Sequence, residues 1–208
     1  MDKNRAKKIL NLLKKNYPNA KIVLNYSNNF ELLVAVMLSA QTTDAQVNKV
    51  TEKLFSKYRN GNSELEEIER FASSDLSELE KDIKSIGLYK TKAKNIKNTS
   101  RLLLEKFNGK IPKTIKELTS LPGVGRKTAN VVLGNAYGIS EGIAVDTHVR
   151  RLSKIYGFTK ENDPEKIEKD LMKLFNKNDW IKITYLLIEH GRNVRKLKKD
   201  FILEQGEH

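Results

Sequence analysis

Residues 121–130 read LPGVGRKTAN, and this stretch decides the fold that we predict for the chain. It interrupts two segments whose apolar residues recur with helical spacing. Leu121 and Val124 are spaced to fill the groove between the two helices, while Gly123 and Gly125 permit positive φ and a close approach of the backbone. The sequence therefore predicts a helix, a tight turn and a second helix.

The turn ends at the start of the second helix, where backbone N–H groups have no partner within the helix. These groups and the helix dipole attract anions, so the amides around Gly123 and Gly125 can hold a phosphate whatever the base sequence. The order of residues, apolar-Pro-Gly-apolar-Gly followed by two basic residues, is typical of a helix-hairpin-helix motif. An ordinary connection between two helices is the alternative.

Lys127 is the candidate nucleophile of this turn. Its simpler role is to neutralise a phosphate, and that alternative stays open. An attacking amine must be neutral, and partial burial, the neighbouring Arg126 and the positive end of the helix dipole would all favour the neutral form. A neutral amine can form a Schiff base with the aldehyde carbon of a sugar.

Asp146 lies in GIAVDTHVRRL, residues 142–152, between a short apolar run and a helical segment. This position predicts an N-cap for a helix that begins at Thr147. A carboxylate can also accept a proton from a lysine and stabilise positive charge on a sugar ring. The two roles of Asp146 are compatible.

Helical spacing extends through almost the whole chain, and no alternating strand pattern of useful length occurs. Residues 44–58 and 92–107 predict amphipathic helices, and residues 30–40 are apolar on nearly every side, as in a fully surrounded helix. We expect an all-α fold with roughly ten helices. Start signals stand at Asp75, Thr114 and Asp163, and stop signals at Gly87, Gly138 and Gly157.

The amino-acid composition limits the kinds of partner that we expect for this chain. The chain has 39 Lys and Arg against 26 Asp and Glu, a formal net charge of +13, which favours a polyanion. Nucleic acid is the first candidate, an anionic membrane surface the second, and a lysine-rich surface without a partner the third. No stretch approaches the roughly 18 apolar residues of a membrane span. The start, MDKNRAKKIL, lacks the apolar core of a signal peptide, so we expect an intracellular, cytoplasmic protein. We expect a monomer, because a cleft formed within one chain needs no dimer.

Four motifs in order resemble the endonuclease III branch of the helix-hairpin-helix DNA glycosylases. They are LLVAVMLSAQTTDAQVNKV (32–50), SIGLYKTKAKNI (85–96), LPGVGRKTANVVL (121–133) and IAVDTHVRRL (143–152). The resemblance runs from about residue 30 to residue 192. It implies two helical lobes with a DNA cleft between them: a six-helix lobe over 23–139 that contains the hairpin, and a second lobe from 1–22 and 140–208.

The resemblance also implies a reaction. Lys127 would attack the sugar carbon that bears a damaged base, with the help of Asp146, and β-elimination from the Schiff base would nick the strand. The substrate would be damaged, oxidised pyrimidines in duplex DNA, or abasic sites. The hairpin residues Leu121, Gly123, Val124, Gly125 and Arg126 would bind the DNA.

Two further residues match positions that act on the DNA helix. Gln41 matches the glutamine that fills the gap left by an extruded nucleotide, and Leu88 matches a wedge that presses into the opposite strand. Without the resemblance, Gln41 would be a polar residue at a helix end and Leu88 a hydrophobic residue at a helix C-cap.

The chain departs from the family at its C-terminal end. Most members carry four cysteines that hold a 4Fe–4S cluster, but this chain has no cysteine, and Arg195 stands where the first is expected. We therefore expect no cluster and no other cofactor. No carboxylate cluster accompanies His148 or His190, so no metal site is expected. Apolar packing would hold the second lobe, with candidates Trp180, Ile183, Leu186, Leu187 and Phe201.

The basic run Arg195, Lys196, Lys198 and Lys199 is either a further DNA contact or a solvated helix face. Two other functions stay open. One is a non-catalytic helix-hairpin-helix protein that only binds DNA, against which the presence of both Lys127 and Asp146 weighs. The other is a glycosylase for alkylated or mismatched bases.

Overall fold

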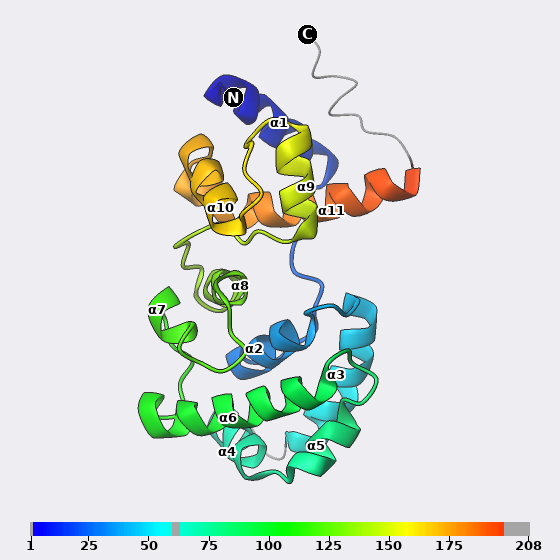
Figure 1. Ribbon diagram of the computed structural model, residues 1–208, viewed down its shortest axis with the longest axis vertical. Coiled ribbons are helices and arrows are strands. Elements are labelled where there is room, and N and C mark those ends of the chain that lie inside the picture. Colours follow the sequence, from blue (N-terminus) through cyan, green and yellow to red (C-terminus); the bar gives the residue numbers. More distant parts are fainter. Residues whose placement is uncertain (1, 60–62, 198–208) are drawn as a thin grey trace. The chain divides into compact units, whose positions relative to one another are not determined.

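The computed structural model describes residues 2–59 and 63–197. This part of the chain forms eleven α-helices and one 3-10 helix without any strand, which confirms the all-α prediction (Figure 1). The chain divides into two compact units. Unit 1 combines residues 1–22 with 140–208, and unit 2 comprises Val23–Ile139.

Unit 2 is built around α2, the segment that is apolar on nearly every side. All residues from Phe30 to Leu38 are buried, because α2 contacts α3, α4, α6 and α8. The surrounded helix predicted over 30–40 is thereby confirmed. The helices of unit 2 are α2 (Asn29–Leu38), α3 (Asp44–Tyr58), α4 (Glu64–Ser73), α5 (Leu76–Asp82), α6 (Tyr89–Phe107), α7 (Ile115–Leu118) and α8 (Arg126–Tyr137).

The predicted helix starts are confirmed by side-chain caps. The Asp75 and Asp163 carboxylates accept hydrogen bonds from backbone N–H groups three residues ahead. Thr114 accepts the N–H of Glu117 at 3.2 Å, and its hydroxyl donates to the Glu117 carboxylate at 2.8 Å. Each cap satisfies an N–H group that the helix itself leaves without a partner.

The predicted helix ends are confirmed at Gly138 and Gly157, which have φ of 64° and 72°. The stop predicted at Gly87 is wrong. Helix α5 already ends at Asp82, and the left-handed residue of the following turn is Leu88, with φ of 58°. Gly87 has no positive φ, so the strained position belongs to a leucine.

A buried carboxylate lies where α4 meets the start of α2. The Glu67 side chain is 2% exposed, and its Oε2 accepts a hydrogen bond from Asn28 Nδ2 at 2.8 Å. Its other oxygen, Oε1, is buried without a partner in the described chain. Burial raises the pKa of Glu67 to about 7, and the neighbouring Glu31 carboxylate acts in the same direction.

Glu67 makes the stability of the protein depend on pH. Its pKa is higher in the folded than in the unfolded chain, so the folded state binds more protons between about pH 4.5 and 7. Below that pH window, Glu67 makes its full contribution to the free energy of unfolding. This contribution falls by up to about 3 kcal/mol as the pH rises through the window. Glu67→Gln, which mimics the protonated acid, should raise Tm at pH 8 and leave it nearly unchanged at pH 4.5.

Thermal unfolding followed by circular dichroism at both pH values measures this effect. Glu66→Gln is the matched control, because Glu66 is the exposed neighbour on α4. If Glu67→Gln and Glu66→Gln shift Tm equally at pH 8, the buried carboxylate is not the cause.

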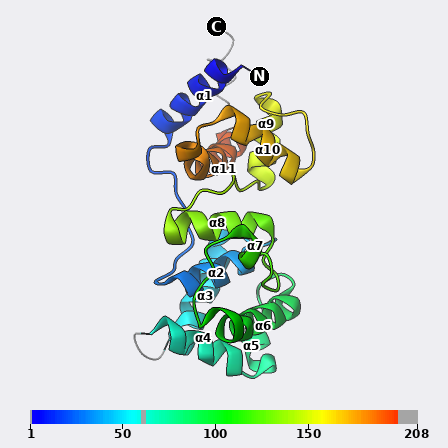
Figure 2. The same cartoon turned by 90° about the vertical axis from the view of Figure 1, so that its left-hand side faces the viewer.

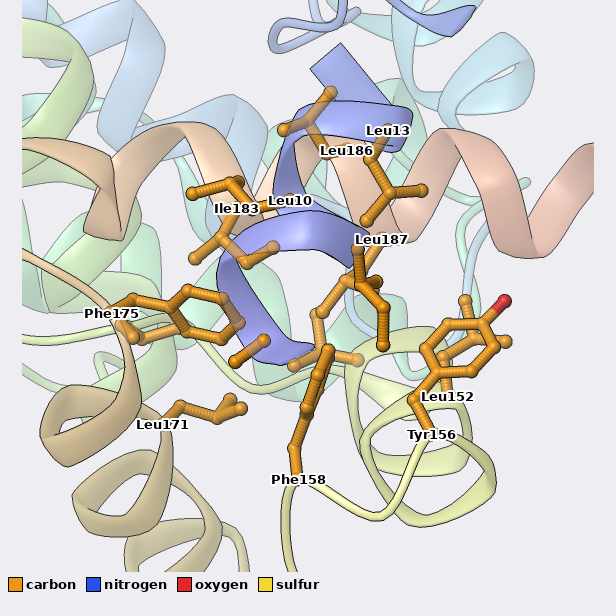
Figure 3. Close-up of a cluster of buried hydrophobic side chains, with 14 of the residues drawn as sticks. Leu10, Leu13, Leu152, Tyr156, Phe158, Leu171, Phe175, Ile183, Leu186 and Leu187 are labelled. Carbon is orange, nitrogen blue, oxygen red and sulfur yellow. The ribbon is translucent and has the colours of Figure 1, made fainter. Parts of the chain in front are cut away.

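Unit 1 is held together by an apolar cluster that α1, α9, α10 and α11 share with the loops between them (Figure 3). Ile183, Leu186 and Leu187 on α11 are fully buried in it, as predicted. Trp180 is partly buried at its edge and donates its indole N–H to the Phe175 carbonyl at 3.0 Å. Phe201 lies outside the described residues. The elements are α1 (Lys3–Asn16), α9 (Thr147–Ile155), α10 (Pro164–Leu174), the 3-10 helix η1 (Lys177–Asp179) and α11 (Trp180–Leu197).

His190 joins three helices of unit 1. It is fully buried, with Nδ1 at 3.0 Å from the Tyr17 hydroxyl and Nε2 at 2.5 Å from the Tyr156 hydroxyl. Both ring nitrogens are therefore occupied by hydrogen bonds that tie α11 to α9 and to the end of α1. This arrangement gives His190 a structural role.

Candidate functional site

The helix, turn and second helix that the sequence predicts are α7, the turn and α8, and the two helices contact each other in unit 2 (Figure 2). The side chains of Leu121 and Val124 are 2% and 5% exposed, and the Val124 N–H donates to the Leu121 carbonyl at 3.1 Å. Thr99 on α6 donates its hydroxyl to the Pro122 carbonyl at 3.0 Å. Leu121 and Val124 are therefore core residues of unit 2, and the exposed residues of the turn are Gly123 and Gly125.

The two glycines of the turn have different roles. Gly123 has φ of 77°, and a Cβ there would lie 2.6 Å from Asn95 Nδ2, so both conformation and space require glycine. Gly125 is the N-cap of α8 in an extended conformation, with φ of −86°. The positive φ that glycine permits is therefore used at Gly123 and not at Gly125. A Cβ on Gly125 would meet no atom within 4 Å, so this side of the turn is open.

The open side of Gly125 leads to the N-terminus of α8. No side chain of Gly125 can cap the first N–H groups, and the first turn of α8 holds no acidic residue. It carries Arg126 and Lys127 instead, so backbone and side chains present positive charge together. The site suits a phosphate.

Lys127 lies in the first turn of α8 with an exposed side chain. The partial burial expected from the sequence is not observed. An exposed amine beside a phosphate site is well placed to reach a sugar attached to that phosphate.

Asp146 is the N-cap of α9, as predicted, because its Oδ1 accepts the Val149 N–H at 2.8 Å. The buried residues Ile143, Ala144 and Val145 precede it and anchor its backbone in unit 1. The Asp146 side chain is half-buried, and the cap uses one of its two carboxylate oxygens. The second oxygen, Oδ2, is the atom that a reaction would require.

Gln41 and Leu88 share an unusual geometry. Both are exposed and both have left-handed backbones, with φ of 56° and 58°. Leu88 is 61% exposed, more than the other large exposed hydrophobic residues of the described chain. It precedes α6 as an N-cap, so the C-cap alternative for Leu88 is wrong.

The turns that carry these two residues touch each other. A Cβ on Gly87 would lie 3.5 Å from the Gln41 carbonyl oxygen, and Gln46 Nε2 donates to Ser85 Oγ at 2.8 Å. Unit 2 therefore brings Gln41 and Leu88 into one neighbourhood, although the sequence separates them widely. Asp146 belongs to unit 1, so its pairing with Lys127 stays a prediction.

The sequence leaves two roles open for the C-terminal basic run, a further DNA contact or a solvated helix face. Arg195 and Lys196 belong to the last turn of α11, but their side chains lie outside the described part of the chain. Lys198 and Lys199 lie outside it altogether. This contact also stays a prediction.

Two residues that support the site were not predicted. Asn95 packs against Gly123, and Lys92 is buried with its ammonium group bonded to the segment that carries Gln41. The signal for Lys92 was its spacing, because Lys92, Ile96 and Thr99 share the buried face of α6. A lysine on such a face requires polar partners inside the fold.

The residues of this chain do not fit a 4Fe–4S cluster, since it has no thiolate to bind iron. Within residues 2–59 and 63–197, no three His, Asp or Glu side chains gather in a way that could hold a metal ion. No helix among them combines the length and the apolar character that crossing a membrane requires.

Three comparisons with known proteins match this chain to one family. Residues 34–177 match the family model "HhH-GPD superfamily base excision DNA repair protein". Endonuclease III from Synechocystis sp. is 48% identical over 197 residues, which cover 95% of this chain and 87% of the relative. Endonuclease III from Bacillus subtilis is 49% identical over 177 residues, covering 85% of this chain and 77% of the relative.

A solved structure described as a trapped endonuclease III–DNA covalent intermediate is 45% identical, with a TM-score of 0.86. The match covers 93% of this chain and 87% of the other. Proteins that share only a fold can have much lower sequence identity than this. The identity found here extends over both units of the chain and therefore indicates common family membership. The chain therefore belongs to the HhH-GPD superfamily of base excision DNA repair proteins, as one of its endonuclease III relatives.

Proposed function

We propose that this protein is a bifunctional DNA N-glycosylase and AP lyase that removes damaged, oxidised pyrimidines from duplex DNA through a Schiff base on Lys127. The observation that carries the proposal is the exposed Lys127 amine in the first turn of α8, next to the open backbone at Gly125. A phosphate held there would fix one sugar within reach of the amine. That a related endonuclease III was trapped as a covalent DNA intermediate supports the same chemistry.

The reaction begins with the neutral amine of Lys127. Its nitrogen attacks C1′ of the deoxyribose, the bond from C1′ to the base breaks, and the base leaves with that electron pair and takes up a proton from water. The Oδ2 atom of Asp146 would accept the proton that the amine loses and stabilise positive charge on the sugar. Opening of the sugar ring leaves an imine between Lys127 and C1′.

The imine then allows the strand to break. A proton acceptor removes a proton from C2′, and the electrons of that C–H bond form a double bond between C2′ and C3′. The bond from C3′ to the phosphate oxygen then breaks. Water hydrolyses the imine and restores the Lys127 amine. The products are the free base, an unsaturated sugar at one end and a 5′-phosphate at the other.

Gln41 and Leu88 would open the duplex for this reaction. A glycosylase must extrude its target nucleotide, at a cost of a few kcal/mol for unstacking. Gln41 would fill the gap and Leu88 would press between the bases of the opposite strand. The exposed, left-handed conformation of both residues supports this assignment, because it holds them away from the helices that flank them.

The remaining contacts follow from charge. The hairpin amides and Arg126 would bind one strand, and Arg195, Lys196, Lys198 and Lys199 would add a second basic contact. The net charge of +13 favours such a polyanion. We propose an intracellular monomer that acts on the nucleoid.

Borohydride trapping tests the proposal. The wild-type protein, incubated with duplex DNA that carries one abasic site and then reduced, should form a covalent protein–DNA adduct that denaturing electrophoresis resolves. A parallel panel of duplexes should show faster release of oxidised pyrimidines than of an alkylated purine or a mismatched thymine. DNA binding without any adduct would instead favour a non-catalytic binding protein. Faster release of the alkylated purine or the mismatched thymine would show that the substrate is not an oxidised pyrimidine.

A further inference from the structure

Lys92 occupies a place in unit 2 that none of the steps above uses. Its side chain is only 6% exposed and forms no ion pair in the described chain. Its Nζ donates to the Leu38 carbonyl at 2.8 Å and to the Ala40 carbonyl at 2.5 Å, and it lies 3.4 Å from the Thr42 hydroxyl. The three N–H donors of the ammonium group therefore match three oxygen acceptors.

These acceptors surround Gln41. Leu38 is the last residue of α2, and its carbonyl is one of those that a helix leaves without an internal partner. A cation at this end also interacts favourably with the helix dipole. Since Ala40 and Thr42 flank Gln41 directly, the ammonium group fixes the chain on both sides of its left-handed backbone.

The backbone of Lys92 is tied to the other turn. Its N–H donates to the Leu88 carbonyl at 3.0 Å, which forms the first turn of α6. Lys92 thus holds the Leu88 turn through its main chain and the Gln41 turn through its side chain. The close approach of Gly87 to the Gln41 carbonyl shows that the two turns are in contact.

We propose that Lys92 is a positioning residue that couples the turns of Gln41 and Leu88, so that both side chains enter the DNA duplex as one rigid unit. The inference rests on the proposed roles of Gln41 and Leu88. Burial lowers the pKa of Lys92 because it penalises the charged form, yet three oxygen acceptors favour the charge. A neutral, apolar side chain here would remove the hydrogen bond that Lys92 donates to the buried Leu38 carbonyl.

Lys92→Met tests this coupling, because methionine is unbranched like lysine but donates no hydrogen bond. The matched control is Lys94→Met, which removes the same charge from an exposed position of α6. Single-turnover release of an oxidised pyrimidine should fall about 10- to 100-fold in Lys92→Met, since small displacements of positioning groups have effects of this size. Incision of a preformed abasic site should fall less, because no base has to be extruded.

A fluorescence measurement separates this inference from the proposed chemistry. Duplex DNA with an uncleavable abasic analogue opposite 2-aminopurine reports unstacking on binding and requires no reaction. Wild-type protein and Lys94→Met should raise the fluorescence, whereas Lys92→Met should raise it much less at saturating protein. An equal rise in Lys92→Met would overturn the inference even if base release is slow.

The double variant decides whether Lys92 acts through Gln41. If it does, Lys92→Met should cost little further activity in a Gln41→Ala background, since the residue to be positioned is absent. Additive losses of activity in the double variant would overturn the inference, and so would wild-type activity in Gln41→Ala. In either case the proposed function would still stand if the wild-type protein forms the covalent adduct. Lys92→Gln keeps N–H donors on a shorter stem and should show an intermediate loss, which provides the test if Lys92→Met does not fold.

Discussion

Lys127→Gln is expected to abolish the borohydride adduct and to slow strand incision at an abasic site by about 10³-fold or more. Glutamine has similar length and polarity, but its amide nitrogen cannot form a Schiff base. The proposed phosphate site would depend mainly on backbone amides around Gly123 and Gly125, so the variant should still bind DNA. Single-turnover incision and filter binding to an uncleavable abasic analogue measure the two properties separately.

Lys116→Gln is the control for the loss of a positive charge, because Lys116 lies exposed on α7, the other helix of the hairpin. It should form the adduct as the wild type does and bind DNA with slightly lower affinity. An undiminished adduct in Lys127→Gln would identify another amine as the nucleophile. If Lys127→Gln lowers DNA affinity as much as it lowers activity, Lys127 acts only as a phosphate contact.

Substitutions of Asp146 can separate its helix-capping role from its proposed role in the reaction. Its Oδ1 caps α9, and asparagine caps helices about as well as aspartate. Asp146→Asn should therefore keep the stability of unit 1 but lose base release by about 10²- to 10³-fold, because an amide cannot accept a proton or stabilise a cation. Asp146→Ala should lose the same activity and, in addition, about 1 kcal/mol of unfolding free energy.

Asp163 is the matched control for the cap. It occupies the same position at α10 in the same unit, and its carboxylate accepts the Lys166 N–H at 3.0 Å. Asp163→Ala should lose a similar amount of stability, measured by denaturant unfolding, with no loss of activity at a temperature where the protein stays folded. If Asp146→Asn releases base at the wild-type rate, the carboxylate has only the capping role.

The parts of this protein that the sequence determined are those that depend on neighbours within one helical turn. The buried face of a helix follows from apolar residues three and four positions apart, and α2 is surrounded because it is apolar on nearly every side. Caps such as Asp146 and Thr114 are equally local, since each bonds an N–H three residues ahead. The hairpin turn was predictable for the same reason.

The tertiary structure decided what depends on distant segments meeting. Gly123 must be glycine partly because Asn95 of α6 lies beside it, whereas the space beside Gly125 is open, and the sequence presents the two glycines alike. The left-handed residue at the start of α6 is Leu88 and not the glycine before it, and their turn lies against the segment of Gln41. Lys92 bonds to carbonyls more than fifty positions earlier in the chain, and Glu67 is buried against Asn28. Charge and polarity are properties of a residue, but their partners and their burial are properties of the packed fold.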